Sequence, residues 1–270
     1  MDSKQNLISL SKQILEQINT HILKDNQPNI VQEGFEWLRE SLSLLAKQSS
    51  LFESSLILLE KNKEEEAFVL TRSQFNNALW INYLCKDENG ERFKEYTYEP
   101  TKYQIRQLIN ARKYIMGLPE EPQYKDFPTL LDSINHKITE CKQYLKSEGI
   151  SNKNLKTKSI YDLSKEDLTL WGMYLSFYFN ASKFEHADIS TVANFREQIM
   201  DEYSINDVFR FNMSKSNESL WKVVFRWAIQ ILYTTIDVLY KRIKILNIIS
   251  EETFYSLIIY LKTALDMTDR

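Results

Sequence analysis

The chain has 270 residues with a net charge of −3, and 43% of its residues are hydrophobic. The near-balanced charge excludes a general attraction to nucleic acids or anionic membranes. The low counts of 5 Gly and 5 Pro argue against tight hairpins and phosphate-binding loops, because both need residues that tolerate positive φ. We therefore predict an all-α fold, a bundle of roughly seven to nine helices.

Apolar residues recur at helical spacing through the N-terminal third of the chain. The first predicted helix ends before Pro28, and a second covers about residues 31–47. Residues 51–84 are apolar on several faces, which is typical of a helix in the middle of a bundle. The apolar stripe of the first helix consists of Leu7, Leu10, Ile14, Ile18 and Ile22.

Two further helices are predicted in the middle of the chain. Turn residues at 87–90 precede the first of them, which is kinked near Pro100 and ends at Met116. Asp126 begins the second, which ends before Gly149 because glycine favours the C-terminal end of a helix.

A polar, lysine-rich stretch at residues 149–163 is the best candidate for a linker. We expect a single all-helical domain over residues 1–270, with a sub-boundary at this stretch. Ser164 and Asp167 resemble the two ends of a capping box, which predicts a helix from there to about His186.

The least helical part of the chain follows. We predict a short irregular or extended insertion near residues 203–217, where the segment DVFRFNM alternates apolar and polar residues. Helices resume over about residues 218–246 and 251–265.

Several features bear on the compartment. The N-terminal stretch lacks the continuous apolar core of a signal peptide. Lys222, Arg226 and Asp237 interrupt the most apolar helix, which predicts a core helix and not a membrane span. Cys85 and Cys141 are predicted to be reduced, buried thiols. We expect a cytoplasmic protein without membrane contact.

Arg72 is the first candidate site residue, because an arginine within a nearly all-apolar helix needs a partner. Asn76 lies one turn further on, on the same face. Two interpretations stay open at this point. Arg72 holds a phosphate or carboxylate ligand in a bidentate manner, or it pins two helices together, capped by Asn76 and by a carboxylate from elsewhere in the chain.

The second candidate is the helix that carries Tyr174, Tyr178, Ser182 and His186 at intervals of four residues. This spacing places them on nearly the same face and predicts a hydrogen-bonded polar ladder. In the functional interpretation His186, with Glu185 beside it, transfers protons. In the structural interpretation the ladder only satisfies its own polar groups, and we favour this one.

Motifs of the common enzyme classes are absent from the sequence. It contains no HExxH, CxxC, GxSxG, GxGxxG or P-loop pattern. We therefore predict neither a metal site nor a cofactor.

The helices EAFVLTRSQFNNALWINYL and YLSFYFNASKFEHAD together resemble a large bacterial family of unknown function. Its members share a helix of the form EA…RS…E…YL and a later helix of the form Y…S…H. The resemblance covers about residues 30–195 and implies an all-helical fold and an association with phage-defence or toxin-like systems. The matching residues are Glu66, Ala67, Arg72, Ser73, Tyr178, Ser182 and His186.

This chain departs from the family pattern at Asn76, where members usually carry a glutamate. It also lacks the hallmark of HEPN ribonucleases, another helical class in bacterial defence, in which His follows Arg by four to six residues. An Arg72–His186 pair would therefore have to form between two helices. In such a site the histidine would act on a ribose 2′-hydroxyl while the arginine held the phosphate.

Two hypotheses for function follow. In the first, the chain is an interaction or sensor module of a bacterial stress or phage-defence system with a protein partner. In the second, it is an RNA-cleaving, toxin-like enzyme with Arg72 and His186 as catalytic residues. Asn76, Tyr178, Ser182 and Glu185 are binding candidates in both. We also predict a homodimer through the aromatic helix around Trp221 and Trp227, because so much apolar surface lies on one helix.

Overall fold

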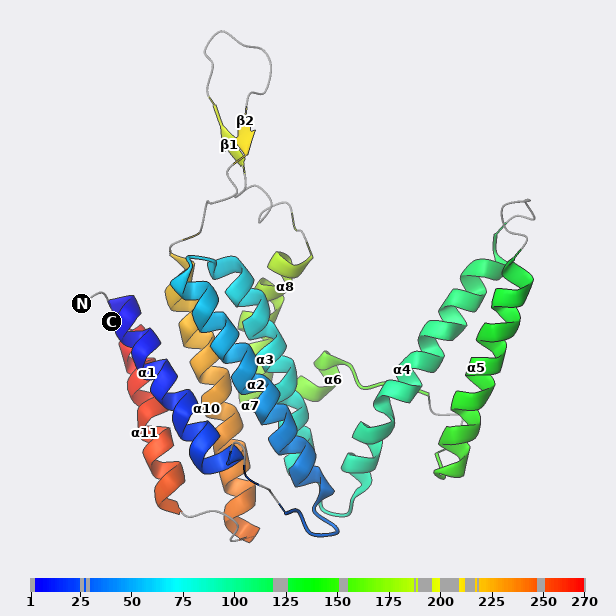
Figure 1. Cartoon of the computed structure of the whole chain (residues 1–270), viewed down its shortest axis with the longest axis horizontal. Helices are drawn as coiled ribbons and strands as arrows, with labels where there is room; N and C mark the ends of the chain where they lie inside the picture. The colour runs from blue at the N-terminus through cyan, green and yellow to red at the C-terminus, as the bar shows by residue number, and fades with distance from the viewer. Residues whose placement is uncertain are drawn as a thin grey trace. The chain divides into compact units, whose positions relative to one another are not determined.

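Helices dominate the chain in the computed structural model (Figure 1). The structure describes residues 3–24, 27, 30–118, 126–150, 155–186, 188, 196–199, 209–211, 217, 219–246 and 251–269. The α-helices are α1 (Ser3–Gln17), α2 (Glu36–Glu60), α3 (Glu64–Cys85), α4 (Glu91–Met116), α5 (Phe127–Ser147), α6 (Ile160–Ser164), α7 (Leu168–Met173), α8 (Phe179–Glu185), α10 (Leu220–Leu246) and α11 (Glu251–Thr268).

Two short π-helical segments continue α-helices without a break. The segment η1 (Ile18–Leu23) extends α1, and η3 (Tyr174–Tyr178) joins α7 to α8. Counted as continuous helices, the described residues form nine helices. The predicted all-α fold is confirmed.

The chain divides into two compact units. The first contains residues 1–87 and 160–270, and the second contains residues 88–159. One boundary falls inside the predicted linker at 149–163 and the other at the predicted turn at 87–90. The expectation of a single domain over the whole chain stays a prediction.

The first unit is built around α3 and α10. The helix α3 packs against both α2 and α10, while α10 also packs against α11, and α1 contacts α2 and α11 (Figure 1). Phe52, Phe75 and Phe225 are among the largest fully buried side chains. A buried hydrogen bond from Gln48 Nε2 to Thr235 Oγ1, 3.0 Å long, links α2 to α10.

The predicted break between residues 47 and 51 is wrong, because α2 runs through it to Glu60. Serine disfavours helix interiors when its hydroxyl competes for backbone groups, but Ser54 and Ser55 instead donate to carbonyls four residues earlier in the same helix. The helical backbone is instead interrupted at Asn62, between α2 and α3. Its φ of 54° lies in the left-handed region that asparagine tolerates.

The cap of α7 also differs from the prediction. Asp167 is the N-cap residue, and its carboxylate accepts hydrogen bonds from the amides of Thr169 (2.9 Å) and Leu170 (3.1 Å). Ser164 belongs to the end of α6, where its hydroxyl donates to the carbonyl of Tyr161. The helix therefore begins three residues later than the capping-box pattern indicates, because the carboxylate of Asp167 satisfies two of the free amides of its first turn.

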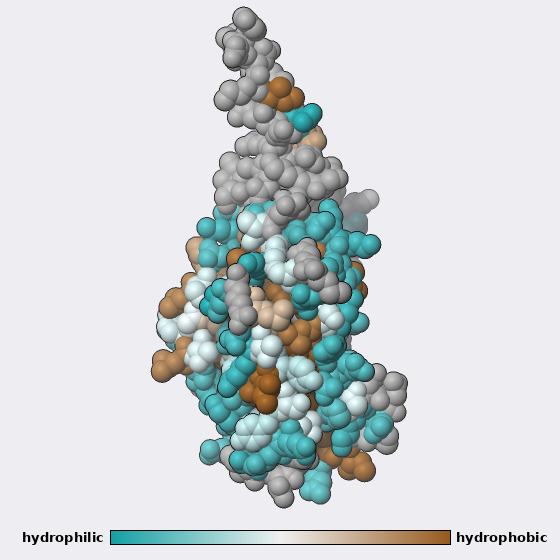
Figure 2. All heavy atoms as spheres, turned by 90° about the vertical axis from the view of Figure 1, so that its left-hand side faces the viewer, coloured by the Kyte–Doolittle hydropathy of each residue, from teal (hydrophilic) through white to brown (hydrophobic). Residues whose placement is uncertain are grey.

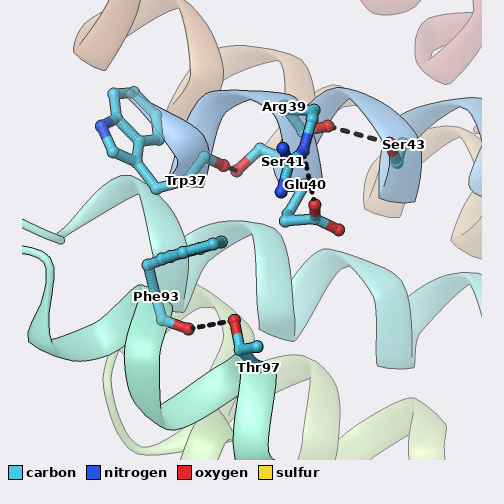
Figure 3. Close-up of polar contacts among 7 residues, drawn as sticks. All are labelled: Trp37, Arg39, Glu40, Ser41, Ser43, Phe93 and Thr97. Carbon is cyan, nitrogen blue, oxygen red and sulfur yellow. Dashed lines mark hydrogen bonds and ion pairs between the residues drawn. The ribbon is translucent and has the colours of Figure 1, made fainter. Parts of the chain in front are cut away.

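The second unit is a helical hairpin of α4 and α5. Pro100 lies within α4, and Thr97 Oγ1 donates to the carbonyl of Phe93 in the turn before it (Figure 3). The Tyr98 hydroxyl donates to Glu148 at 2.7 Å. The core of the hairpin is small and consists of Tyr98, Ile105, Cys141 and Leu145, with Ile109, Ile150 and Leu155 packed against it.

The described chain also contains one antiparallel pair of short strands, β1 (Arg196–Gln198) and β2 (Phe209–Phe211). The strand β2 lies in the segment DVFRFNM, so the expected extended backbone is present there. The rest of the predicted insertion near 203–217, apart from residue 217, lies outside the described residues.

Within the described residues, Leu220–Lys244 of α10 is the one stretch long and apolar enough to cross a membrane by length and composition. It is 56% buried inside the protein, and Trp227 packs against Phe177 with ring centres 5.2 Å apart. On the face that carries the terminal helices, hydrophobic patches are separated by hydrophilic residues (Figure 2). The absence of membrane contact and the homodimer both stay predictions.

Candidate functional site

An aromatic contact positions α3 against η3 and α8. Phe68 and Phe75 lie one turn before and one turn after Arg72, and both rings pack edge-on against Phe177, at 5.4 and 5.9 Å between ring centres. Phe68 also meets Phe184 of α8 at 5.5 Å. Because Arg72 lies between two anchored aromatic residues, its side chain is held toward the same neighbouring helix.

The guanidinium of Arg72 has three partners on that helix. Its Nε donates to Ser182 Oγ at 3.0 Å, its Nη2 donates to the Tyr178 hydroxyl oxygen at 2.8 Å, and its Nη1 forms an ion pair with Glu185 Oε2. The guanidinium carbon also lies 4.5 Å from the centre of the Tyr178 ring. These four residues, here named the Arg72 cluster, leave the arginine side chain only 14% exposed.

The polar atoms of the Arg72 cluster are largely committed to one another. Ser182 Oγ accepts from Arg72 and donates to the backbone carbonyl of Tyr178 at 2.8 Å. Burial raises the pKa of the Tyr178 hydroxyl above its usual value, although the charge of Arg72 opposes the rise. Tyr178 is therefore a neutral phenol at physiological pH, and it accepts a hydrogen bond from Arg72 instead of acting as a base.

His186 lies at the C-terminal end of α8, where its backbone amide donates to the carbonyl of Ser182 at 3.1 Å. Its side chain is 68% exposed, and its Nε2 lies 3.5 Å from Glu185 Oε2. Arg72 and His186 therefore meet the same carboxylate oxygen, while the described contacts include none between the two. The predicted catalytic pair is joined through Glu185 and not directly.

Asn76 is not a partner of Arg72. The two residues are one turn apart on α3, and the buried Oδ1 of Asn76 has no hydrogen-bond partner among the described residues. The prediction that Asn76 caps Arg72 is therefore wrong. The predicted carboxylate from elsewhere in the chain is Glu185, a distant neighbour in sequence.

A comparison with protein families assigns the chain to a family. Residues 41–203 match the model of DUF5677, described as a family of unknown function. The chain belongs to DUF5677. All members of the Arg72 cluster, and His186, lie within the matched residues. No curated protein and no solved structure matches the chain.

The DUF5677 region also holds an aromatic ladder that the sequence analysis missed. Trp171 stacks on Tyr174 with ring centres 5.5 Å apart, and Tyr174 stacks on Tyr178 at 5.3 Å. Tyr161 of α6 packs edge-on against Trp171, and the Lys165 ammonium lies 3.8 Å from the centre of the Tyr161 ring. The stack therefore extends from the Arg72 cluster toward a second cation. The spacing of aromatic residues at 171, 174 and 178 is its sequence signal.

Helical spacing explains why the predicted ladder of Tyr174, Tyr178, Ser182 and His186 is only partly present. In an α-helix a step of four residues is slightly more than one full turn, so the face drifts along the ladder. Tyr178, Ser182 and Glu185 follow one another at steps of four and three and stay on one face, whereas His186 lies off that face. As a result Glu185, and not His186, reaches Arg72. The π-turn η3 comes just before this segment, and π-turns often occur at functional sites.

No cluster of three or more His, Cys, Asp or Glu residues in the described part of the DUF5677 chain could hold a metal ion. The prediction of no metal and no cofactor is not tested by this observation and stays a prediction.

Proposed function

We propose that this DUF5677 protein is a cytoplasmic binding module, an interaction or sensor component of a bacterial stress or phage-defence system with a protein partner. One observation favours this proposal over an enzymatic role. The guanidinium of Arg72 is already bonded to Tyr178, Ser182 and Glu185 and is only 14% exposed, so it serves as an inter-helix pin.

A ligand phosphate at Arg72 would have to displace these internal partners. Separating a partly buried ion pair without a full replacement costs free energy, because one charge is left without compensation. A binding module does not need that displacement, since its work is done on the surface. The defence-related setting comes from the family resemblance of the two motif helices.

The surface beside the Arg72 cluster supports a protein partner. Leu175 of η3 is 59% exposed and Phe179 of α8 is 67% exposed, and His186 lies on the same continuous helix. Interfaces in proteins are enriched in exposed aromatic and apolar side chains with a polar rim. A partner that covers Leu175 and Phe179 would place a polar contact against His186.

A second candidate function is RNA cleavage, and one observation favours it. Glu185 Oε2 contacts both the Arg72 guanidinium and the exposed His186 imidazole. If Glu185 swung away, the arginine would be left facing a phosphate while His186 acted as general acid or base. The enzyme hypothesis therefore requires a rearrangement that the binding hypothesis does not.

RNA integrity in bacteria that express the protein distinguishes the two functions. The comparison includes wild type, His186→Ala and the matched control His136→Ala. His136 is a histidine of α5 whose side chain is 77% exposed. Circular dichroism first shows that each protein folds. Binding alone predicts intact RNA in all three cultures. Cleaved RNA with wild type and His136→Ala, but not with His186→Ala, would establish the ribonuclease instead.

A further inference from the structure

A groove separates α1 and η1 from α2 in the first unit, away from the Arg72 cluster. Its larger part has a volume of about 760 Å³ and its smaller part about 590 Å³. The two parts form one elongated depression, because they share the lining residues Leu15, Asn19, Lys24, Gln27 and Glu53. Its apolar lining includes the buried side chains of Leu15 and Leu56.

Charged side chains of both signs line the groove, with acids in excess. Arg39 pairs with Glu40 at 2.8 Å (Figure 3), and Lys12 pairs with Glu60 at 2.6 Å. Because neither of these two acids lines the groove, each pair neutralises a cation of the lining. The remaining charged residues of the lining are Glu16, Glu33, Glu36, Glu53 and Lys24, which gives a charge of 1 − 4 = −3.

Ser49 provides an independent sign of a ligand. It lines the groove from α2, is 4% exposed, and its hydroxyl has no hydrogen-bond partner among the described residues. Ser41 and Ser43 of the same helix instead donate to the carbonyls of Trp37 and Arg39 (Figure 3). A buried hydroxyl without a partner is unfavourable, so a polar group supplied by a ligand would complete it.

The acids are spread along the groove: Glu36 lines only its larger part, and Glu53 lines both parts and therefore lies where they join. Glu36 and Glu53 are both on α2, and a helical rise of ~1.5 Å per residue puts their Cα atoms about 25 Å apart. Backbone hydrogen bonds from the amides of Glu36 and Gly34 lower the pKa of the Glu36 carboxyl, so it is ionised at neutral pH. The other side of the groove includes Asn19, from the π-turn η1.

We propose that this groove binds a linear aliphatic polyamine. A terminal ammonium group would meet Glu36 in the larger part, another amine would meet Glu53 where the two parts join, and the methylenes would cover the apolar lining between them. An amine of the chain would supply the missing hydrogen bond of Ser49. This site does not depend on the role of the Arg72 cluster, so either proposal can fail without the other.

Calorimetric titration of the full chain with spermine, at fixed ionic strength, tests the proposal. We expect saturable one-to-one binding to wild type. Glu53→Gln and Glu36→Gln should each weaken binding about fivefold, because each removes one exposed ion pair. The matched control Asp266→Asn, an exposed acid on α11 outside the groove, should bind as wild type does.

Ser49→Ala gives a second readout. It should not lower the unfolding temperature of the ligand-free protein, because it removes a buried hydroxyl that has no described partner, and it should weaken spermine binding about fivefold by removing one hydrogen bond to the ligand. Absence of binding, or equal weakening by Asp266→Asn and the groove variants, would overturn the proposal. Equal binding of magnesium at the same charge concentration would also overturn it, because that result shows a general effect of charge.

Discussion

Arg72 carries a full charge on a side chain that is only 14% exposed. Each of its three partners contacts a different nitrogen of the guanidinium: a hydroxyl contacts Nε, a phenol contacts Nη2 and a carboxylate contacts Nη1. This arrangement lowers the cost of desolvating the charge and fixes the side chain in one direction. The internal arginine therefore has a structural role, because it links α3 to the helix that carries its three partners.

Replacing Arg72 by Ala should lower the free energy of unfolding by about 2–4 kcal/mol, because Glu185 loses its partner and two hydrogen bonds disappear. The control is Arg226→Ala, since Arg226 pairs with Asp269 while 58% exposed. That variant should change stability by no more than about 0.5 kcal/mol. Denaturant unfolding of both variants measures the difference, and equal losses would count against a structural role for the Arg72 cluster.

The buried thiol of Cys85 predicts a pH dependence. Burial raises its pKa from 9.0 to about 12, so the unfolded chain loses this proton at a lower pH than the folded chain does. The stabilising contribution is complete below pH 9 and is lost as the pH rises toward 12, by about 1.4 kcal/mol per pH unit. Between pH 8 and 10.5, wild type should lose about 2 kcal/mol more than Cys85→Ala. An equal loss in both proteins would contradict burial of the thiol.

At the scale of elements, the aromatic contact of α3 with η3 and α8 holds the Arg72 cluster in place. Phe177 is fully buried between Phe68, Phe75 and Trp227. Two residues later on the same continuous helix, Phe179 is 67% exposed. The two phenylalanines therefore provide a matched pair for a test of packing.

Phe177→Ala should destabilise the first unit by about 3–5 kcal/mol, since it removes a large buried ring and leaves a cavity. Phe179→Ala should change stability by no more than about 0.5 kcal/mol. Thermal unfolding compares them. If Phe179→Ala proved as destabilising as Phe177→Ala, its ring would have to be covered by part of the protein, and the proposed partner surface would be lost.

Much of the Arg72 cluster was predictable from the sequence, and the predictions that were wrong have local causes. An arginine in an apolar helix requires partners across the bundle, and Tyr178, Ser182 and Glu185 were all candidates. The precise partner was not predictable, because a four-residue spacing drifts round the helix and the sequence does not show which part of that face lies against Arg72. Asn76 failed for a different reason: four-residue spacing makes contact feasible but does not select it over a stronger carboxylate partner.

At the scale of the whole molecule, the chain forms one unit from two distant segments and a second unit from the stretch between them. The sequence indicated both boundary regions through a turn and a polar linker. It could not show that residues 1–87 join residues 160–270, because that depends on which apolar faces match in space. The groove between α1 and α2 was missed for the same reason, since its lining comes from separate elements.

The small core of the hairpin predicts that the second unit can open by itself. Leu145 is fully buried there, whereas Leu130 of the same helix is 45% exposed. Leu145→Ala, which costs about 2–5 kcal/mol in a buried site, should abolish hydrogen-exchange protection in α4 and α5 and leave α3 protected. Leu130→Ala should preserve protection in both units. Simultaneous loss of protection in α3 would show that the two units unfold as one.

The central claim is that Arg72 is committed to Glu185 within the protein. A double-mutant cycle with Arg72→Ala, Glu185→Ala and the double variant measures the free energy that couples them. A coupling of at least about 1 kcal/mol is predicted, because the two charges meet in a partly buried contact. Zero coupling, with both single variants as stable as wild type, would contradict the account and point to Arg72 as a residue held ready for a ligand.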